Sequence, residues 1–404
     1  MAPALRPARL DELQDAILEA NARGERLEIV GHATKARVGA PAPEAQRLDL
    51  NHFNALIDYD PAELVLTAGA AAPLAEIEAL LEGHGQMLAF EPMDYGALFG
   101  AEDGGTLGGM VSANASGPRR LVAGAARDHF LGLTAVSGRG DLFKGGGKVV
   151  KNVTGYDVPK LLAGAWGTLA AMTEVTLKVL PRPRTEATAL IAGLTDAEAC
   201  RAMSLALGAP AGVTAAAHLP AGLAARTAGL AGAAGALTLL RLEGVEPSIR
   251  SGFEVLRDRL GGRALDGLQP AGSRALWRHL RDAGPLAADP RPLWRVSVPP
   301  ADGWRAMQAL GGDGFQGFYD WAGGLLWIAA EAAADAGAEA VRAAARHLGG
   351  HATLVRAPEG VRAAVPVFQP EPQALAALSA RVKAAFDPRG VLNPRHRLAP
   401  PAGA

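Results

Sequence analysis

The sequence of 404 residues predicts an α+β protein of two domains, on three observations. Patterns of short strands and helices alternate through the first 180 residues. Pro181 and Pro183 then interrupt a strand pattern. Beyond them the composition changes, because Ala and Gly dominate 205–237 and aromatic residues return from Trp277 onward. We therefore place a domain boundary after residue 180.

The first domain begins with a helix over 8–23, where apolar residues recur at helical spacing until Gly24 ends the pattern. Short strands are expected at 27–30, 48–50 and 64–67. A helix is expected over 73–82, with Pro73 near its first turn. Apolar residues alternate with polar ones over 173–179, which predicts a half-buried strand.

The second domain interleaves strands and helices, which suits an α+β cap domain. Strands are expected at 237–242, 293–298 and 324–329, and helices at 247–260, 301–310 and 334–348. A further helix follows Glu371.

Composition excludes several classes of protein. The net charge of -1 shows no basic bias toward nucleic acid or anionic membranes. The single cysteine, Cys200, excludes an intrachain disulfide framework and a cluster ligated only by this chain's cysteines. No apolar run approaches the ~20 residues of a membrane span, and no signal peptide is visible. We expect a cytoplasmic protein, with any contact at the inner face of the membrane peripheral and made through partners.

Two glycine-containing segments suggest a ligand that lies against the backbone. Glycines crowd 104–117, and small residues fill the gaps between them. Glycine permits close approach and positive φ, and this run offers little to a core. The loop Gly31–Lys35 follows a strand, where successive amides can converge on an anion. The competing interpretation of 106–116 is a tight turn followed by a helix of small residues.

The order of three motifs resembles the FAD domain of the vanillyl-alcohol oxidase/PCMH-type superfamily. They read GGTLGGMVSANASGPRR from 104, KNVTGYDVPKL from 151 and GAWGTLAAMTEV from 164. SGPRR and KNVTGYDVPKL are most similar to the FAD-binding E subunits of glycolate oxidases. The segment DPRGVLNP near the C-terminus resembles the superfamily's terminal motif. The resemblance implies an FAD domain of two α/β subdomains over 1–180, completed by 371–404, and a smaller cap domain over 181–370.

The resemblance also implies how FAD binds. Residues 30–35 would wrap the pyrophosphate, and 106–117 would pass along the flavin and pyrophosphate, with side-chain hydrogen bonds from Ser112 and Asn114. Gly167 and the backbone near Met172 would hold the adenine side. The expected cofactor-binding residues are Val30, Gly31, His32, Ala33, Thr34, Lys35, Pro92, Thr106, Leu107, Gly108, Gly109, Ser112, Asn114, Gly117, Gly167, Met172 and Asn393.

Many superfamily members attach FAD through a histidine in the first loop. Here Ala33 occupies that position, so we expect non-covalent FAD and His32 near the phosphates; attachment through His32 is the alternative. Other motifs fail: the glycines of 229–235 do not read G-x-G-x-x-G, and Gly147-Lys148 lacks the rest of a P-loop. His347 and His351 are separated by Gly349 and Gly350, so no metal site is expected.

Catalytic residues cannot be assigned from the sequence. The related D subunits of glycolate oxidases carry a histidine-rich H-G-D-G-N-x-H-type stretch, and nothing like it occurs over 280–370. Oxidising an alcohol requires a base for its proton. The resemblance therefore implies an FAD-binding subunit of a glycolate-type 2-hydroxy-acid oxidoreductase that acts with a catalytic flavoprotein of the D type and an iron–sulfur protein of the F type. A stand-alone FAD oxidase and a flavin-free structural subunit are the alternatives. Phe315, Phe318 and Trp321 are candidates for partner docking, although we favour core packing as their role.

Overall fold

The computed structural model describes residues 3–101, 104–149, 155–263, 265–312, 314–331 and 333–396. They divide into two compact units. The first takes its described residues from Met1–Ser116, Gly124–Arg182 and Pro366–Ala404, and the second from Gly117–Ala123 and Pro183–Val365. Each unit contains both sheets and helices, which confirms the predicted α+β class. Within these residues no helix is long and apolar enough to cross a membrane.

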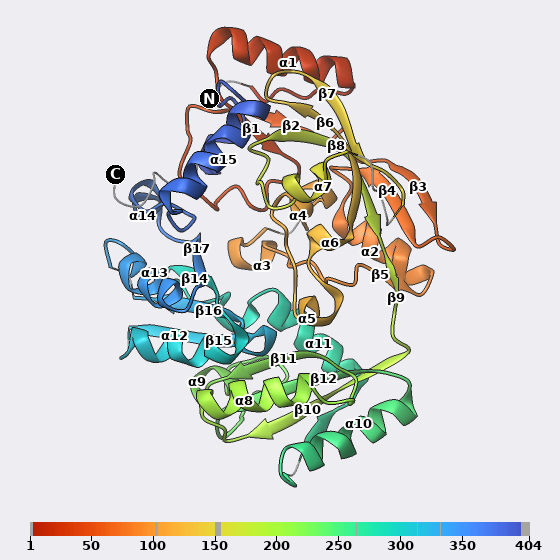
Figure 1. Cartoon of the computed structure of the whole chain (residues 1–404), viewed down its shortest axis with the longest axis vertical. Coiled ribbons are helices and arrows are strands. Elements are labelled where there is room, and N and C mark those ends of the chain that lie inside the picture. Colours follow the sequence, from red (N-terminus) through yellow and green to blue (C-terminus); the bar gives the residue numbers. More distant parts are fainter. Residues whose placement is uncertain are drawn as a thin grey trace. The chain divides into compact units, whose positions relative to one another are not determined.

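The first unit contains two short strand pairs, a five-stranded sheet and helices along the edges (Figure 1). Its elements are α1 Leu10–Arg23, β1 Leu27–Val30, β2 Gln46–Asp49, β3 Leu56–Asp60, β4 Val65–Gly69, α2 Leu74–Gly83, β5 Gln86–Met87, α3 Gly96–Phe99, α4 Leu107–Ser112, α6 Ala126–His129, β6 Phe130–Ser137, β7 Leu142–Gly146, α7 Val158–Leu162, β8 Ala170–Lys178, β9 Leu180–Pro181, α15 Gln373–Phe386 and the 3-10 turn η4 Pro394–His396.

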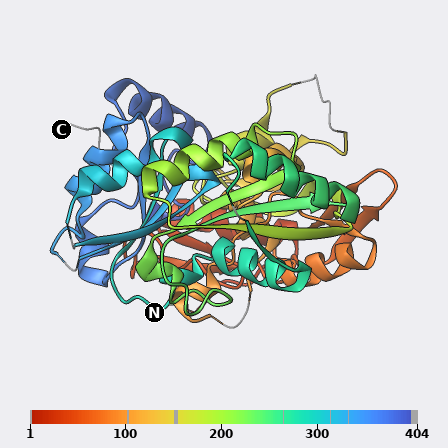
Figure 2. The same cartoon turned by 90° about the horizontal axis from the view of Figure 1, so that it is seen from below.

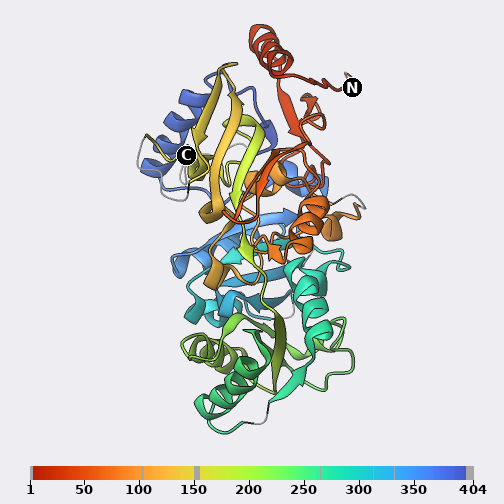
Figure 3. The ribbon, with the colours of Figure 1, turned by 90° about the vertical axis from the view of Figure 1, so that its right-hand side faces the viewer.

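The five-stranded sheet has the order β3-β4-β8-β6-β7, and all its neighbours are antiparallel. The helix α15 lies beside the β6–β7 hairpin, where Phe386 contacts Phe143 with ring centroids 5.9 Å apart (Figure 3). The pair β1 and β2 is parallel. Leu13 and Ile17 of α1 are fully buried in a core shared with Leu27 and Leu48 of these strands. The apolar spacing that predicted α1 thus faces the β1–β2 pair.

The C-terminal segment closes the first unit by binding the beginning of β1. The Leu27 amide donates to Val391 O at 2.8 Å, and the Asn393 amide donates to Leu27 O at 2.8 Å. Asp387 fixes the turn that precedes this contact, because its carboxylate accepts from the amides of Val391 and Leu392, each at 2.9 Å. Lys383 of α15 forms an ion pair with the same carboxylate.

The second unit is built on an eight-stranded sheet of order β13-β10-β12-β11-β15-β16-β14-β17. Its elements are α5 Arg120–Ala123, β10 Thr185–Ala192, α8 Asp196–Leu207, β11 Val213–Leu219, α9 Ala221–Ala224, β12 Leu237–Gly244, α10 Glu246–Arg259, β13 Asp266–Leu268, α11 Pro270–Arg281, β14 Leu293–Ser297, α12 Gly303–Leu310, β15 Phe315–Asp320, β16 Leu325–Ala330, α13 Ala338–His347, β17 His351–Arg356 and α14 Glu359–Ala364, with the 3-10 turns η1 Gly284–Leu286, η2 Pro300–Asp302 and η3 Trp321–Gly323.

One face of this sheet carries the main core of the second unit. Helices α8, α10, α12 and α13 bury their apolar residues there, against side chains such as Trp294 and Leu240. Helix α11 packs against β10 through Trp277, whose indole N–H donates to Thr188 Oγ1 at 2.9 Å. Figure 2 shows the strands between α8 and α10 on one side and α11 on the other.

Two of the docking candidates are not surface residues. Phe318 is fully buried and Trp321 is 4% exposed. The Trp321 indole N–H donates to Gly117 O at 2.9 Å. The guanidinium groups of Arg120 and Arg295 lie 4.5 and 5.0 Å from its ring centre. Phe318 and Trp321 therefore have the core-packing role that was the favoured expectation, and the alternative that they dock a partner is wrong for both.

The Asp387 turn gives a test of how the first unit is closed. We expect Asp387→Asn to lower the free energy of unfolding by about 2–4 kcal/mol, since two amides and the Lys383 ammonium lose a charged acceptor. Chemical denaturation measures this change. Asp141→Asn is the control, because Asp141 is largely exposed and its ion pair is with exposed Arg139. Equal effects of the two substitutions would contradict this role for Asp387.

Candidate functional site

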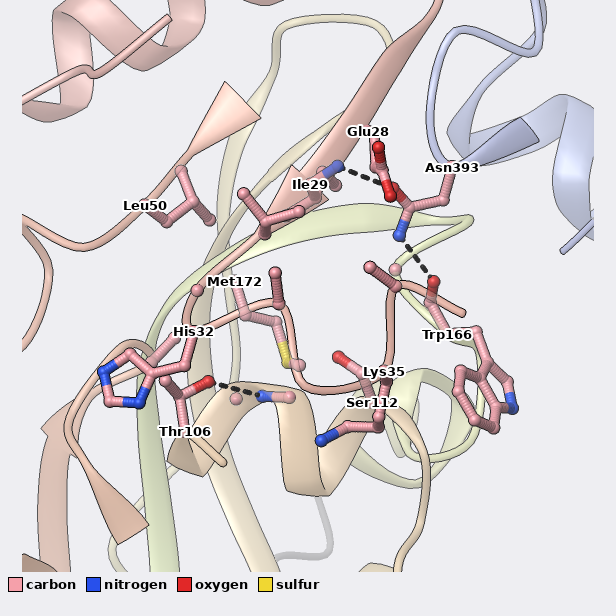
Figure 4. A pocket seen from close by; sticks show the side chains of 18 of the residues that line it. Glu28, Ile29, His32, Lys35, Leu50, Thr106, Ser112, Trp166, Met172 and Asn393 are labelled. Carbon is pink, nitrogen blue, oxygen red and sulfur yellow. Dashed lines mark hydrogen bonds between the residues drawn. The ribbon is translucent and has the colours of Figure 1, made fainter. Parts of the chain in front are cut away.

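An open pocket in the first unit collects residues from six separate segments of the chain (Figure 4). They come from β1 and the loop after it, Leu50 after β2, residues 70–71 after β4, the beginning and body of α4, residues 166–172 at the beginning of β8, and the C-terminal segment. The lining residues are Glu28, Ile29, Val30, Gly31, His32, Ala33, Thr34, Lys35, Ala36, Leu50, Ala70, Ala71, Thr106, Gly108, Gly109, Ser112, Trp166, Gly167, Ala170, Met172, Asn393, Arg395 and His396.

The loop 31–35 presents unused backbone donors to this pocket. Among the described residues, none of its five amide groups donates a hydrogen bond. Ala33 takes a positive φ of 54°, so the backbone turns within the loop. The ring of His32 lies within hydrogen-bond distance of Gly104 O, at 2.7 Å from Nδ1. A carbonyl can only accept, so Nδ1 carries the proton. Successive amides without partners form the arrangement that binds anions.

Lys35 adds a positive charge at the end of this loop. Its Nζ lies 3.4 Å from Thr34 Oγ1 and 5.3 Å from the centre of the Tyr95 ring. No carboxylate within the described part of the chain forms an ion pair with it. Burial lowers the pKa of Lys35 to about 8, and the charge of Asp94 partly offsets this effect. The ammonium is therefore held in the pocket wall without an ion-pair partner.

Helix α4 forms the opposite wall and packs tightly on β4. The Gly108 amide donates to Ala70 O at 2.6 Å and the Leu107 amide to Ala72 O at 3.0 Å, while the hydroxyl of Thr106 accepts from the Gly109 amide at 3.3 Å. The segment 107–112 is thus the small-residue helix that was the competing interpretation. The amides of Leu107, Gly108 and Gly109 are therefore already used as donors within the protein. Gly108, Gly109 and Ser112 instead offer the pocket a surface without large side chains.

Asn393 joins the two ends of the pocket. Its Oδ1 accepts from the Ile29 amide at 2.7 Å, and its Nδ2 donates to Trp166 O at 2.6 Å. Figure 4 shows these two bonds between β1 and the segment that carries Trp166. Trp166, Gly167 and Asn393 all take positive φ, at 53°, 68° and 45°. The Asn393 side chain thus holds three unusual backbone positions in place rather than pointing freely into the pocket.

The structure brings most of the expected residues together. Those that line the pocket are Val30, Gly31, His32, Ala33, Thr34, Lys35, Thr106, Gly108, Gly109, Ser112, Gly167, Met172 and Asn393. Pro92, Leu107, Asn114 and Gly117 do not line it. Leu107 is fully buried, the side chain of Asn114 accepts from the Arg127 amide at 3.0 Å, and Gly117 belongs to the second unit.

The sequence analysis did not predict four of the residues that line the pocket. They are the charged pair Glu28 and Arg395 and the aromatic side chains of Trp166 and His396. Arg395 Nε donates to Glu28 Oε1 at 2.6 Å. The His396 ring stacks on Trp166, with centroids 4.7 Å apart. Both nitrogens of His396 are buried without a hydrogen bond, and burial, with the charge of Arg395, lowers the pKa of His396 to about 3. The adjacency of Asn393, Arg395 and His396 in the terminal motif was the available signal.

His347 and His351, the possible metal pair in the sequence, lie on different elements, α13 and β17. Within the residues that the structure describes, no three His, Cys, Asp or Glu side chains gather where they could hold a metal ion.

Comparison with known proteins gives consistent results. Residues 2–146 match a family model described as an FAD binding domain. The chain is 34% identical over 374 residues to glycolate oxidase subunit GlcE of Escherichia coli K12, and this alignment covers 91% of each protein. It is 33% identical over 139 residues to glycolate oxidase subunit GlcD of Bacillus subtilis 168, covering 34% of this chain and 28% of that protein. A structure of p-cresol methylhydroxylase superposes with a TM-score of 0.68 at 13% identity, covering 97% and 88% of the two chains, which shows a shared fold.

The contact between α4 and β4 can be tested at Gly108. A β-carbon at this position would lie 2.7 Å from Ala70 Cβ and 2.8 Å from Ala70 O. We therefore expect Gly108→Ala to lower the free energy of unfolding by about 1–3 kcal/mol through overpacking. Gly147→Ala is the control, since no atom lies within 4 Å of its added carbon. A variant of Gly108 as stable as the control would mean that α4 is not held against β4 as described.

Proposed function

Because this chain belongs to the family of glycolate oxidase subunit GlcE, we propose that it is the FAD-binding subunit of a multi-subunit oxidoreductase acting on a 2-hydroxy acid of the glycolate type. The family to which it belongs is one of FAD-dependent oxidoreductases. The observation that carries the proposal for this site is the set of five amides without acceptors, beside an ammonium that has no ion pair among the described residues, in one pocket.

The residues present fit an FAD molecule chemically. Its pyrophosphate carries negative charge, and the 31–35 loop offers only donors and a cation to satisfy it. Glycine and serine on α4 leave room for a flat ring to lie against backbone. Trp166, Met172 and His396 supply polarizable surface at the other side of the pocket. The sites we assign to FAD are the expected residues that line the pocket. Pro92, Leu107, Asn114 and Gly117 do not line it, and we assign them no contact with the ligand.

When bound, FAD accepts and passes on the electrons removed from the substrate. The chain's own residues bind and orient it. The amides of 31–35 hold the anionic part, and the Thr106 cap and the Gly108 contact fix α4 on the facing wall. Asn393 keeps β1 and Trp166 at a constant spacing. We assign 1–180 with 371–404 to the cofactor and 181–370 to a cap.

The chain also requires partners, in our proposal, to turn over substrate. No histidine-rich segment supplies a base in the cap, so a catalytic flavoprotein similar to the D subunits of glycolate oxidases is the natural site of substrate oxidation. Cys200 is the sequence's only cysteine and is buried, so onward transfer through a cluster needs another protein, similar to the iron–sulfur F subunits of those enzymes. A cytoplasmic complex at the inner face of the membrane would suit this electron transfer.

Two other functions make different predictions. A stand-alone FAD-dependent oxidase of alcohols or hydroxy acids would reduce its own flavin with substrate and complete the cycle without partners. A flavin-free structural subunit would purify colourless. The unpaired donors of the 31–35 loop argue against the second, because buried or half-buried donors without a ligand are uncommon.

The mode of flavin attachment has a direct test. We expect the purified chain to absorb visible light as a flavoprotein and to release FAD into the supernatant on acid precipitation, because Ala33 has no nucleophile. Thin-layer chromatography would identify the released flavin. His32→Ala is the control, and it should leave the released fraction unchanged. Fluorescent protein in the pellet, lost in His32→Ala, would show attachment through His32.

The requirement for partners can be tested by anaerobic mixing. We expect glycolate and D-lactate to leave the flavin of the isolated chain oxidised on the timescale of turnover, since no histidine-rich segment over 280–370 supplies a base for the alcohol proton. The chain co-expressed with D- and F-type subunits should bleach and should reduce an artificial dye. Rapid bleaching and steady dye reduction by the isolated chain would establish it as a complete catalyst.

A further inference from the structure

Besides the paired Glu28 and Arg395, the pocket proposed for FAD is lined by the charged side chain of Lys35, which a backbone-only mode of binding does not require. We propose that the Lys35 ammonium is the counter-charge for the diphosphate of the ligand, so that this chain selects a nucleotide by its diphosphate as well as by its rings. The inference rests on the proposed function, because it assumes that FAD is the ligand.

The position of Lys35 places its charge at the unpaired amides. It is the last residue of the 31–35 loop, whose five N–H groups have no acceptor within the described structure. Its Nζ lies 3.5 and 3.6 Å from where β-carbons would stand on Gly105 and Gly109. Since those residues are glycines, no side chain of theirs separates the ammonium from the space between the loop and α4. A single anion in that space can meet both the amides and the ammonium.

The charge of Lys35 is compensated by the protein only in part, through the nearby Asp94 and the Tyr95 ring. No ion pair to Lys35 occurs among the described residues, and its one hydrogen bond is a long contact with the neutral Thr34 hydroxyl. The ionisable groups that face it are Asp94 and Tyr95 on the segment before α3. α4 contributes no charged side chain. A partly desolvated cation without an ion pair destabilises a protein, so its presence indicates a ligand of opposite charge.

Because Lys35 lies at the proposed diphosphate site, FAD binding should change the protonation of its ammonium. In the ligand-free protein the pKa of Lys35 is about 8, below its unfolded value of 10.5, so the ammonium costs stability at neutral pH. A diphosphate beside it raises this pKa again. Binding at pH 8 should therefore take up about half a proton, and affinity should fall as the pH rises through 8.

The experiment uses flavin-free protein and isothermal titration with FAD, ADP and adenosine. We expect Lys35→Met to weaken FAD and ADP by a similar factor, about 10- to 100-fold, and to leave adenosine unchanged. The uptake of protons at pH 8, measured in buffers of different ionisation enthalpy, should disappear. Lys35→Arg should recover part of the affinity because it keeps the charge. Lys160→Met is the matched control, since that lysine is half-exposed and already paired with Asp157.

Stability separates this role from a structural one. Removal of a charge that the protein compensates only in part should raise the melting temperature of the ligand-free Lys35→Met protein while FAD binding weakens. A lower melting temperature, or equal affinity of wild type and Lys35→Met for ADP, would overturn the inference. If Lys35→Met lost as much affinity for adenosine as for ADP, that result would also overturn the inference. A wild-type protein that binds neither FAD nor ADP would instead refute the proposed function on which the inference stands.

Discussion

The side chain of Asn393 is the interaction on which the cofactor pocket depends. It accepts from Ile29 and donates to Trp166, and so connects three segments that lie far apart in the sequence. Without it, the amide of Ile29 and the carbonyl of Trp166 would face each other across a gap with no partner. Asp387 and Lys383 set the turn that delivers Asn393 to this position. The pocket is therefore completed by the C-terminal segment.

The pocket combines firmly packed walls with unsatisfied polar groups. α4 is held against the segment that follows β4 by hydrogen bonds to Ala70 and Ala72, and the small size of Gly108 permits this close contact. Within the described structure, the opposite loop keeps five amide donors without acceptors and the Lys35 ammonium without an ion pair. Such groups cost stability in the absence of a ligand, and they are the reason the loop can bind an anion strongly. A closely packed wall that faces polar groups without hydrogen-bond acceptors or ion pairs is typical of a preformed binding site.

At the other side of the pocket, unlike at the 31–35 loop, the polar side chains are neutral or paired. His396 is stacked on Trp166 and is held neutral by burial. A neutral imidazole can donate from one nitrogen and accept at the other. With the Glu28–Arg395 pair beside it, this side of the pocket is polar but nearly uncharged in total. The pocket thus has one cationic side and one neutral side, which matches a ligand whose charge is concentrated in its middle.

Strong periodicity in the sequence determined several elements directly. Examples are α1, whose apolar spacing faces β1 and β2, and β8, whose alternation places Val175 and Leu177 in the core. The glycines of 104–117 and the loop 31–35 identified both walls of the pocket, since a close backbone approach demands small residues. The tertiary structure alone decided which amides are free. The amides of Leu107 and Gly108 donate to Ala72 and Ala70, and the amide of Gly109 donates to Thr106, whereas the amides of 31–35 have no acceptor among the described residues. Local sequence does not show this difference, because the acceptors in 70–72 are distant along the chain. The tertiary structure also decided that Asn114 and Gly117 do not line the pocket, because Asn114 bonds the Arg127 amide and Gly117 belongs to the second unit. The Arg395–Glu28 pair forms only when the C-terminal segment folds back onto β1.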